Sequence, residues 1–276
     1  MSLIEIQDAG GSSSVWISGS GKPLVLIHGF PLNHQMWVAQ LESLSHHFQV
    51  IAPDLPGFGR TEIDSVSADG ELRFSMKSMA DWIANLLDLL GVSSKVVYCG
   101  LSMGGYIGWE FARRHTERLD RLIACNTRAA ADTEVVRRGR KLAAREVMQN
   151  GVEPVADAML PKLFSDSVRG EAIRLDHMKQ ARRDTRHAIE TTPSESIAAG
   201  QLAMAARQDA RQWLSQIDIP ALLVAGEYDQ ITPASEMESD ASRMPQAEFV
   251  CIPQAAHMAP LEMPEVFNRE VVQWLQ

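Results

Sequence analysis

The chain has little that would support a disulfide framework and no segment that would anchor it in a membrane. Its 276 residues include three cysteines, Cys99, Cys125 and Cys251, each within or at the end of an apolar strand pattern. We expect small core residues with free thiols, which fits a reducing cytoplasm. No hydrophobic run reaches the roughly 20 residues of a membrane span, and residues 1–6 lack the basic start and apolar run of a signal peptide.

An excess of positive charge is also missing. The formal net charge is −9 at pH 7, which argues against nucleic acid or an anionic membrane as the main partner. The histidines outside the motifs described below show no metal-ligand spacing, so we predict no metal site. The chain does have 45% apolar residues, enough to bury one large core, with or without a lid.

Residues 98–106, Tyr-Cys-Gly-Leu-Ser-Met-Gly-Gly-Tyr, form the most informative segment. They place Ser102 between Gly100 and Gly104, where a strand pattern ends and a helix pattern begins. A turn this tight strains the serine backbone and leaves no room for side chains two positions to either side. The segment predicts a nucleophile elbow, in which Ser102 is the nucleophile and the backbone N–H of Met103 faces the oxygen of a bound substrate.

A serine hydroxyl is a poor nucleophile unless an imidazole takes its proton and a carboxylate orients that imidazole. Asp229 follows a strand pattern at 220–226, and His257 follows another at 247–252. Because sites in open α/β sheets form at the carboxyl ends of strands, we expect Ser102, Asp229 and His257 to lie together.

Three further polar residues are candidates for these roles. Asp54 is an alternative acid, but its Asp-Leu-Pro-Gly setting is typical of a turn. Asn126 also ends a strand pattern, and because it carries no charge, Asp229 remains the predicted acid. His28 ends an early strand pattern, and we predict a hydrogen-bonded structural residue there rather than a base.

In this order, the motifs resemble the α/β-hydrolase family, and the resemblance covers nearly the whole chain. It rests on His-Gly-Phe-Pro at 28–31, Asp-Leu-Pro-Gly-Phe-Gly-Arg at 54–60, Gly-Leu-Ser-Met-Gly-Gly at 100–105, Gly-Glu-Tyr-Asp-x-Ile-Thr-Pro at 226–233 and Ala-Ala-His-Met at 255–258. The resemblance implies that the His-Gly turn supplies a second oxyanion donor, for which the candidate is the backbone N–H of Phe30.

The strand patterns predict an α/β fold, an eight-stranded, mostly parallel sheet with helices on both faces. They lie near 3–7, 13–18, 23–28, 48–53, 95–100, 121–125, 219–226 and 247–252. Between Asn126 and about Arg207 only helical patterns are found, at 133–151, 153–164, 166–183 and 193–206. The resemblance implies a helical cap over Ser102, so we expect a core in two parts, 1–127 and 208–276, around a cap at 128–207.

This constellation predicts a serine hydrolase that cleaves a small ester or lactone through an acyl-enzyme and needs no cofactor. In style the motifs are most similar to 3-oxoadipate enol-lactonases and related carboxylesterases. The same set of residues is also found in cofactor-free haloperoxidase-type perhydrolases and in C–C hydrolases. An alternative from another functional class is a low-turnover, hydrolase-like receptor for a small molecule.

Five residues are candidates for the substrate pocket: Gly29, Trp37, Arg128, Met159 and Met258. Arg128 follows a strand end, so its guanidinium could pair with a substrate carboxylate, a role that a basic stretch around 128–190 would favour. The alternative is that these basic residues lie on solvated helix faces.

Overall fold

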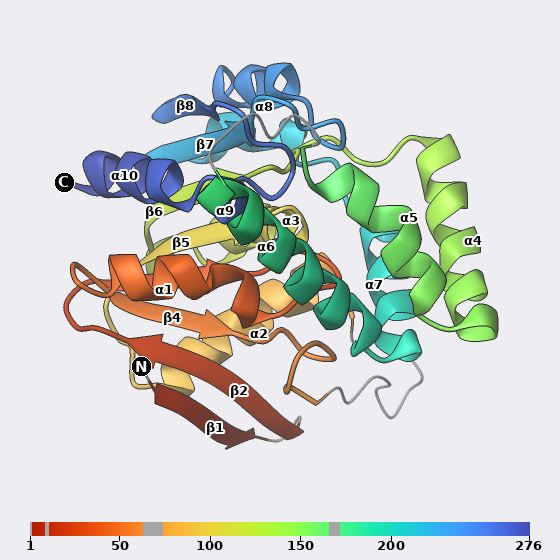
Figure 1. The fold of residues 1–276 in the computed structure, drawn as a ribbon. Helices are drawn as coiled ribbons and strands as arrows, with labels where there is room; N and C mark the ends of the chain where they lie inside the picture. Colours follow the sequence, from red (N-terminus) through yellow and green to blue (C-terminus); the bar gives the residue numbers. More distant parts are fainter. Residues whose placement is uncertain (1, 9–10, 63–73, 166–171) are drawn as a thin grey trace.

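The computed structural model describes residues 2–8, 11–62, 74–165 and 172–276 (Figure 1). Its centre is an eight-stranded sheet in the order β1-β2-β4-β3-β5-β6-β7-β8. The strands are β1 Ser2–Asp8, β2 Gly11–Ser18, β3 Pro23–Ile27, β4 Gln49–Pro53, β5 Val96–Leu101, β6 Leu119–Cys125, β7 Ala221–Gly226 and β8 Ala247–Ile252. The predicted α/β fold is confirmed.

The sheet is mixed at one edge. From β4 to β8 all neighbours pair in parallel, whereas β1 pairs antiparallel with β2, and β2 antiparallel with β4. The chain between β1 and β2 is too short for a crossover, and a hairpin connection joins antiparallel strands. The prediction of a mostly parallel sheet is therefore correct, with this hairpin as the exception.

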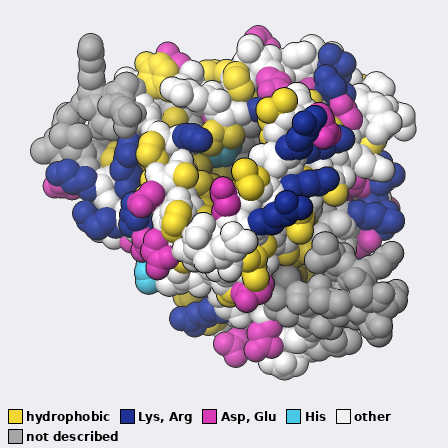
Figure 2. All heavy atoms as spheres, turned by 90° about the vertical axis from the view of Figure 1, so that its right-hand side faces the viewer, with side chains coloured by type: hydrophobic (Ala, Val, Ile, Leu, Met, Phe, Trp, Pro, Cys, Tyr) yellow, Lys and Arg dark blue, Asp and Glu magenta, His cyan; other side chains and the backbone are white. Residues whose placement is uncertain are grey.

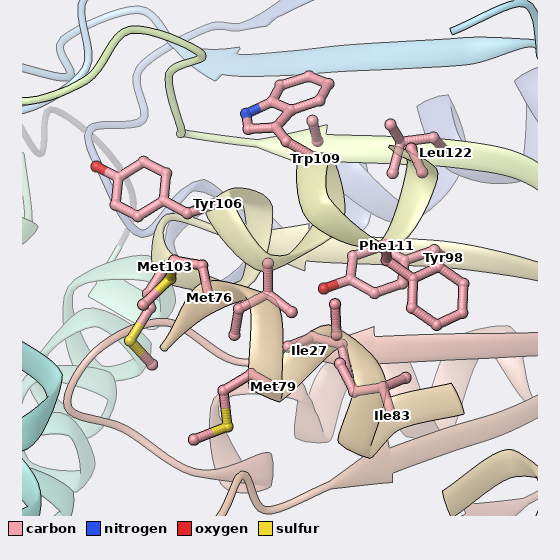
Figure 3. Packing of buried hydrophobic residues seen from close by; sticks show 14 of the residues in the cluster. Ile27, Met76, Met79, Ile83, Tyr98, Met103, Tyr106, Trp109, Phe111 and Leu122 are labelled. Carbon is pink, nitrogen blue, oxygen red and sulfur yellow. The ribbon is translucent and has the colours of Figure 1, made fainter. Parts of the chain in front are cut away.

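Helices cover both faces of the sheet, as alternation along β3 shows. Val25 and Ile27 belong to the apolar cluster on the α2 and α3 side, and Leu24 and Leu26 to the cluster on the α1 and α10 side. In Figure 3, Ile27 lies among α2 and α3 side chains such as Met79 and Met103. The core helices are α1 Val38–Leu44, α2 Met76–Leu89, α3 Met103–Arg114, α8 Ala234–Ala241, α9 Ala259–Glu262 and α10 Pro264–Leu275, with short 3-10 turns η1 His34–Trp37, η2 Thr116–Arg118, η3 Ala210–Gln212 and η4 Leu214–Gln216.

Four helices stand between β6 and β7 and gather at one end of the sheet (Figure 1): α4 Glu134–Asn150, α5 Glu153–Leu163, α6 Ala172–Glu190 and α7 Ser194–Ala206. The predicted ends of the first are confirmed, because the Thr133 hydroxyl accepts from the Val136 N–H and Gly151 ends α4 at φ 80°. The predicted end of the third helix, at 183, is wrong. No glycine or proline interrupts the chain before Pro193, so α6 continues to Glu190. The predicted start at 166 lies outside the described residues.

The three cysteines are free, but they do not all lie in the core. Cys99 and Cys125 are buried, whereas Cys251 is exposed. The expectation of a core position is wrong for Cys251, because β8 is the edge strand of the sheet and has a neighbour on one side alone. None of the helices in the described ranges combines the length and the apolar character needed to cross a bilayer.

Candidate active site

Ser102 occupies the sharp turn between β5 and α3, with φ 55° and ψ −110°. The two flanking glycines are required by close approach. A Cβ on Gly104 would lie 2.3 Å from the carbonyl oxygen of Ile27, and one on Gly100 would lie 2.3 Å from the carbonyl oxygen of Gly104. The predicted steric reason for both glycines is confirmed, and the partly exposed serine stands at the N-terminal end of α3.

Backbone hydrogen bonds join the segments that follow β5, β6, β7 and β8 at one edge of the sheet. The Ser102 N–H donates to the carbonyl of Cys125 (2.9 Å), and the Asn126 N–H donates to that of Val224 (2.8 Å). Beyond β7, the Tyr228 N–H donates to the carbonyl of Ala255 (2.8 Å). The loops that hold the predicted nucleophile, acid and base are therefore joined to one another.

Asp229 and His257 form a buried pair. His257 Nδ1 lies 2.8 Å from Asp229 Oδ2, and the two residues are 3% and 5% exposed. The other carboxylate oxygen, Oδ1, accepts from the backbone N–H groups of Ile231 (2.8 Å) and Thr232 (3.0 Å). Since Asp229 accepts at both oxygens, His257 Nδ1 carries the proton and Nε2 is left as an acceptor.

The surroundings of Asp229 keep its carboxylate ionised. Burial by itself would raise the pKa of Asp229, but the nearby His257 and hydrogen bonds from His257, Thr232 and Asn126 hold that pKa well below its usual range. Asp54, the alternative acid, serves elsewhere: it accepts from the N–H and Nδ1 of His34 (2.8 and 2.7 Å). Its other oxygen accepts from the Arg60 N–H (2.9 Å), so Asp54 anchors the turn that its sequence setting indicated.

Asn126 has a role in the site that the sequence did not predict. Its Nδ2 donates to Asp229 Oδ2 (2.9 Å) and to the carbonyl of Ala256, next to His257 (3.1 Å). Its backbone has φ 44°, a left-handed conformation in which asparagine is enriched. That preference and its position at the end of β6 were the available signals, but they do not reveal which carboxylate faces the amide.

Glu262 was also missed by the sequence reasoning. Its buried carboxylate accepts from the N–H groups on both sides of His257, those of Ala256 (2.8 Å) and Met258 (3.2 Å). The second oxygen accepts from the Ser165 N–H (2.8 Å), just beyond α5. Burial raises the pKa of Glu262, and the backbone N–H groups oppose that rise. One side chain thus ties the His257 loop to the inserted helices.

The two predicted oxyanion donors flank the elbow. Met103 is the first residue of α3, where N–H groups have no partner within the helix. Phe30 follows Gly29, whose added Cβ would lie 3.5 Å from Ser102 Cβ. In the part of the chain that the structure describes, neither the Met103 nor the Phe30 N–H has an acceptor. Both are therefore free to donate to a ligand.

His28 is a structural residue, as predicted. Its Nε2 accepts from the Leu55 N–H (2.9 Å), so Nδ1 carries the proton and donates to the carbonyl of Gly29 (2.9 Å). Burial lowers the pKa of His28 to about 4, so the ring stays neutral.

Ser102 and His257 are not yet joined by a hydrogen bond: none is formed between Ser102 Oγ and His257 within the described ranges. Such a contact often tightens only when substrate binds.

The five pocket candidates differ in their surroundings. Met159 lines a cavity, and Gly29 lies against the elbow. Trp37 and Met258 were wrongly assigned to a pocket: both are 0% exposed and belong to the core on the α1 and α10 side. Arg128 donates to the carbonyl of Ile231 and lies 3.4 Å from Glu236 Oε2.

Within the described ranges no three His, Cys, Asp or Glu side chains are grouped to hold a metal ion.

Comparisons with known proteins agree with the fold described above. The family model for the α/β hydrolase fold matches residues 22–264. A pimeloyl-acyl-carrier-protein methyl ester esterase of Legionella pneumophila is 30% identical over 252 residues, which are 90% of this chain and 93% of that protein. A thermophilic esterase from Thermogutta terrifontis, solved with malate bound, is 36% identical, with a TM-score of 0.88 over 100% of this chain and 98% of its own. An enol-lactonase from Burkholderia xenovorans LB400 is 26% identical, with a TM-score of 0.86 over 99% of both chains.

Proposed function

This chain is a member of the α/β-hydrolase fold family, and we propose that it is a serine hydrolase that cleaves a small carboxylic ester or lactone. The observation that carries the proposal is the buried Asp229–His257 pair at the same sheet edge as the strained Ser102. The chain is similar to two esterases and to an enol-lactonase, and this similarity supports an ester or lactone as the bond that is cleaved.

In the proposed reaction, Ser102 Oγ attacks the substrate carbonyl while His257 Nε2 takes the hydroxyl proton. The tetrahedral intermediate then collapses, the bond to the leaving oxygen breaks, and His257 protonates that oxygen. Water completes the cycle: His257 removes a proton from it, the hydroxide attacks the acyl-enzyme, and the proton returns to Ser102 as the acid leaves. Asp229, held ionised, fixes the tautomer of His257 and stabilises its transient cation.

The oxyanion of each intermediate needs donors that are already in place. We assign this role to the backbone N–H groups of Phe30 and Met103, which have no acceptor within the described ranges. The positive end of α3 adds to the stabilisation, because Met103 begins that helix.

We assign residues 128–207 to a cap between the two parts of the core, 1–127 and 208–276. The cap helices contact loops of the site, and two of these contacts lie beside proposed site residues. The Met258 N–H donates to the carbonyl of Leu163 at the end of α5 (3.1 Å). A Cβ on Gly200 of α7 would lie 2.6 Å from the Phe30 ring. The cap thereby roofs the edge at which the chemistry is proposed.

Steady-state kinetics on a panel of p-nitrophenyl esters and simple lactones test the proposal. We expect sustained turnover that Ser102→Ala abolishes. A single stoichiometric burst followed by silence would instead indicate a receptor-like protein, and turnover that requires hydrogen peroxide would indicate a perhydrolase.

A further inference from the structure

A cavity of about 330 Å³ lies among the inserted helices α4, α5 and α7. Figure 2 shows this side of the molecule, where hydrophobic side chains surround a central hollow and Lys and Arg side chains stand around it. The apolar side chains that line the cavity include Val147, Val155, Met159, Leu163, Ile197 and Ile231. Its volume falls within the range of small-molecule pockets.

The inner wall of this cavity is hydrogen-bonded to Asp229 and to the loop that carries His257. Ile231, which lines the cavity, donates its N–H to Asp229 Oδ1 (2.8 Å). Leu163, also in the lining, accepts the N–H of Met258, the residue after His257 (3.1 Å). A ligand in the cavity therefore lies against the residues that hold the acid and the base.

The polar lining does not favour a ligand of either charge. Glu146 of α4 and Lys162 of α5 carry opposite charges, and neither is paired with another side chain in the described part of the chain. Gln201 already accepts from Arg140 Nη1 (3.1 Å). We therefore expect the apolar side chains of α4, α5 and α7 to determine which ligand the cavity accepts.

We propose that this cavity binds an apolar chain of medium length on the ester substrate, with the scissile carbonyl at Ser102. The inference rests on the proposed function and specifies its substrate class: esters that carry an apolar chain rather than a charged group. The chain belongs either to the acyl part or to the alcohol part of the ester, and the cavity offers the same contacts to both.

Two ester series distinguish these sources. In the first, p-nitrophenyl esters of increasing acyl length, from acetate to decanoate, share one leaving group. In the second, acetate esters carry alkyl alcohols of increasing length. In one of the series kcat/KM should rise about fourfold per methylene until the cavity is filled. A flat response in both series would overturn the inference.

A variant that fills the cavity provides the second test. Ala158 lines the cavity and is exposed, so Ala158→Phe adds bulk there and removes no core contact. Ala143→Phe adds bulk from α4, at a half-buried position of the lining. The control is Gln149→Phe, at an exposed position on α4 outside the lining. With Tm unchanged, the two cavity variants should lower kcat/KM for the longest good substrate at least about tenfold relative to acetate, and the control should not.

The outcomes separate the two proposals. If the wild-type protein hydrolyses no ester, the proposed function fails. If acetate esters are hydrolysed but Ala158→Phe and Ala143→Phe lower activity on short and long chains equally, only the assignment of the cavity fails.

Discussion

Asn126 Nδ2 lies 2.9 Å from Asp229 Oδ2, the oxygen that also faces His257 Nδ1 at 2.8 Å. One carboxylate oxygen thus accepts from the predicted base and from a neutral amide on the neighbouring strand end. The amide helps to keep the pKa of Asp229 low, and through Ala256 it also holds the backbone beside His257. We therefore expect Asn126 to be a positioning residue for the proposed acid–base pair.

Asn126→Ala should lower kcat about tenfold or more and leave KM nearly unchanged, because a hydrogen bond to a charged group contributes about 1.5–3 kcal/mol. Steady-state kinetics on a short p-nitrophenyl ester measure both. Asn268→Ala is the matched control, since Asn268 is also buried but bonds to Gln40 and Ala39 instead. Equal losses of kcat in the two variants would reduce the role of Asn126 to general stability.

Ser102→Ala should remove ester hydrolysis by at least about 10³-fold, and Asp229→Asn should cost a similar factor by favouring the wrong imidazole tautomer. Both proteins should stay folded, which circular dichroism checks. Asp54→Asn is the comparison, because Asp54 is bonded to His34 rather than to His257. Retention of a tenth of the activity in Ser102→Ala, or a larger loss in Asp54→Asn than in Asp229→Asn, would contradict the assignments.

The sequence predicted the elements and the strand ends well, because strand periodicity and turn residues are local signals. It could not predict which face an apolar side chain takes. Trp37 and Met258 lie near the motifs in sequence, but the structure buries both in the core on the α1 and α10 side. Nor could it predict the roles of Asn126 and Glu262, since each depends on a hydrogen bond to a residue far away in the chain, Asp229 for Asn126 and Ser165 for Glu262.

Glu262→Gln should destabilise the protein by about 1–3 kcal/mol, because its amide replaces one of two carboxylate oxygens that accept buried backbone N–H groups. Thermal unfolding gives the loss of stability, and the kcat of the folded variant reports on His257. We expect kcat to fall more than KM rises, since the carboxylate holds the loop on both sides of His257. An unchanged kcat at a lower Tm would make Glu262 a purely structural residue.

Arg128→Ala tests the sequence prediction of an anionic substrate. Because Arg128 is bonded to the carbonyl of Ile231 and faces Glu236, we expect the variant to change KM equally for a carboxylate-bearing ester and its neutral analogue. Glu236→Gln, which removes the same pair from the other side, should behave alike. A KM that rises selectively for the carboxylate-bearing ester would restore Arg128 as a substrate-binding residue.

The buried His28 predicts a pH dependence of stability with a definite sign. Its pKa is about 4 in the folded protein, against an ordinary value of 6.5. Between these values the unfolded chain binds a proton that the folded chain does not, so the free energy of unfolding falls as the pH drops from 6.5 to 4. Above that window His28 has no effect, and across it the loss is about 3 kcal/mol.

His28→Gln isolates this contribution, because glutamine offers an acceptor to the Leu55 N–H and cannot take up a proton. Urea unfolding at pH 7 and pH 5 measures the free energy of unfolding of each protein. The wild-type protein should lose more stability between these pH values than His28→Gln does, by about 2 kcal/mol. The exposed His46 provides the control: His46→Gln should keep the wild-type dependence. If wild-type and His28→Gln lose stability in parallel, the folded protein accepts the proton at His28, and the hydrogen bond from Leu55 does not hold the ring neutral.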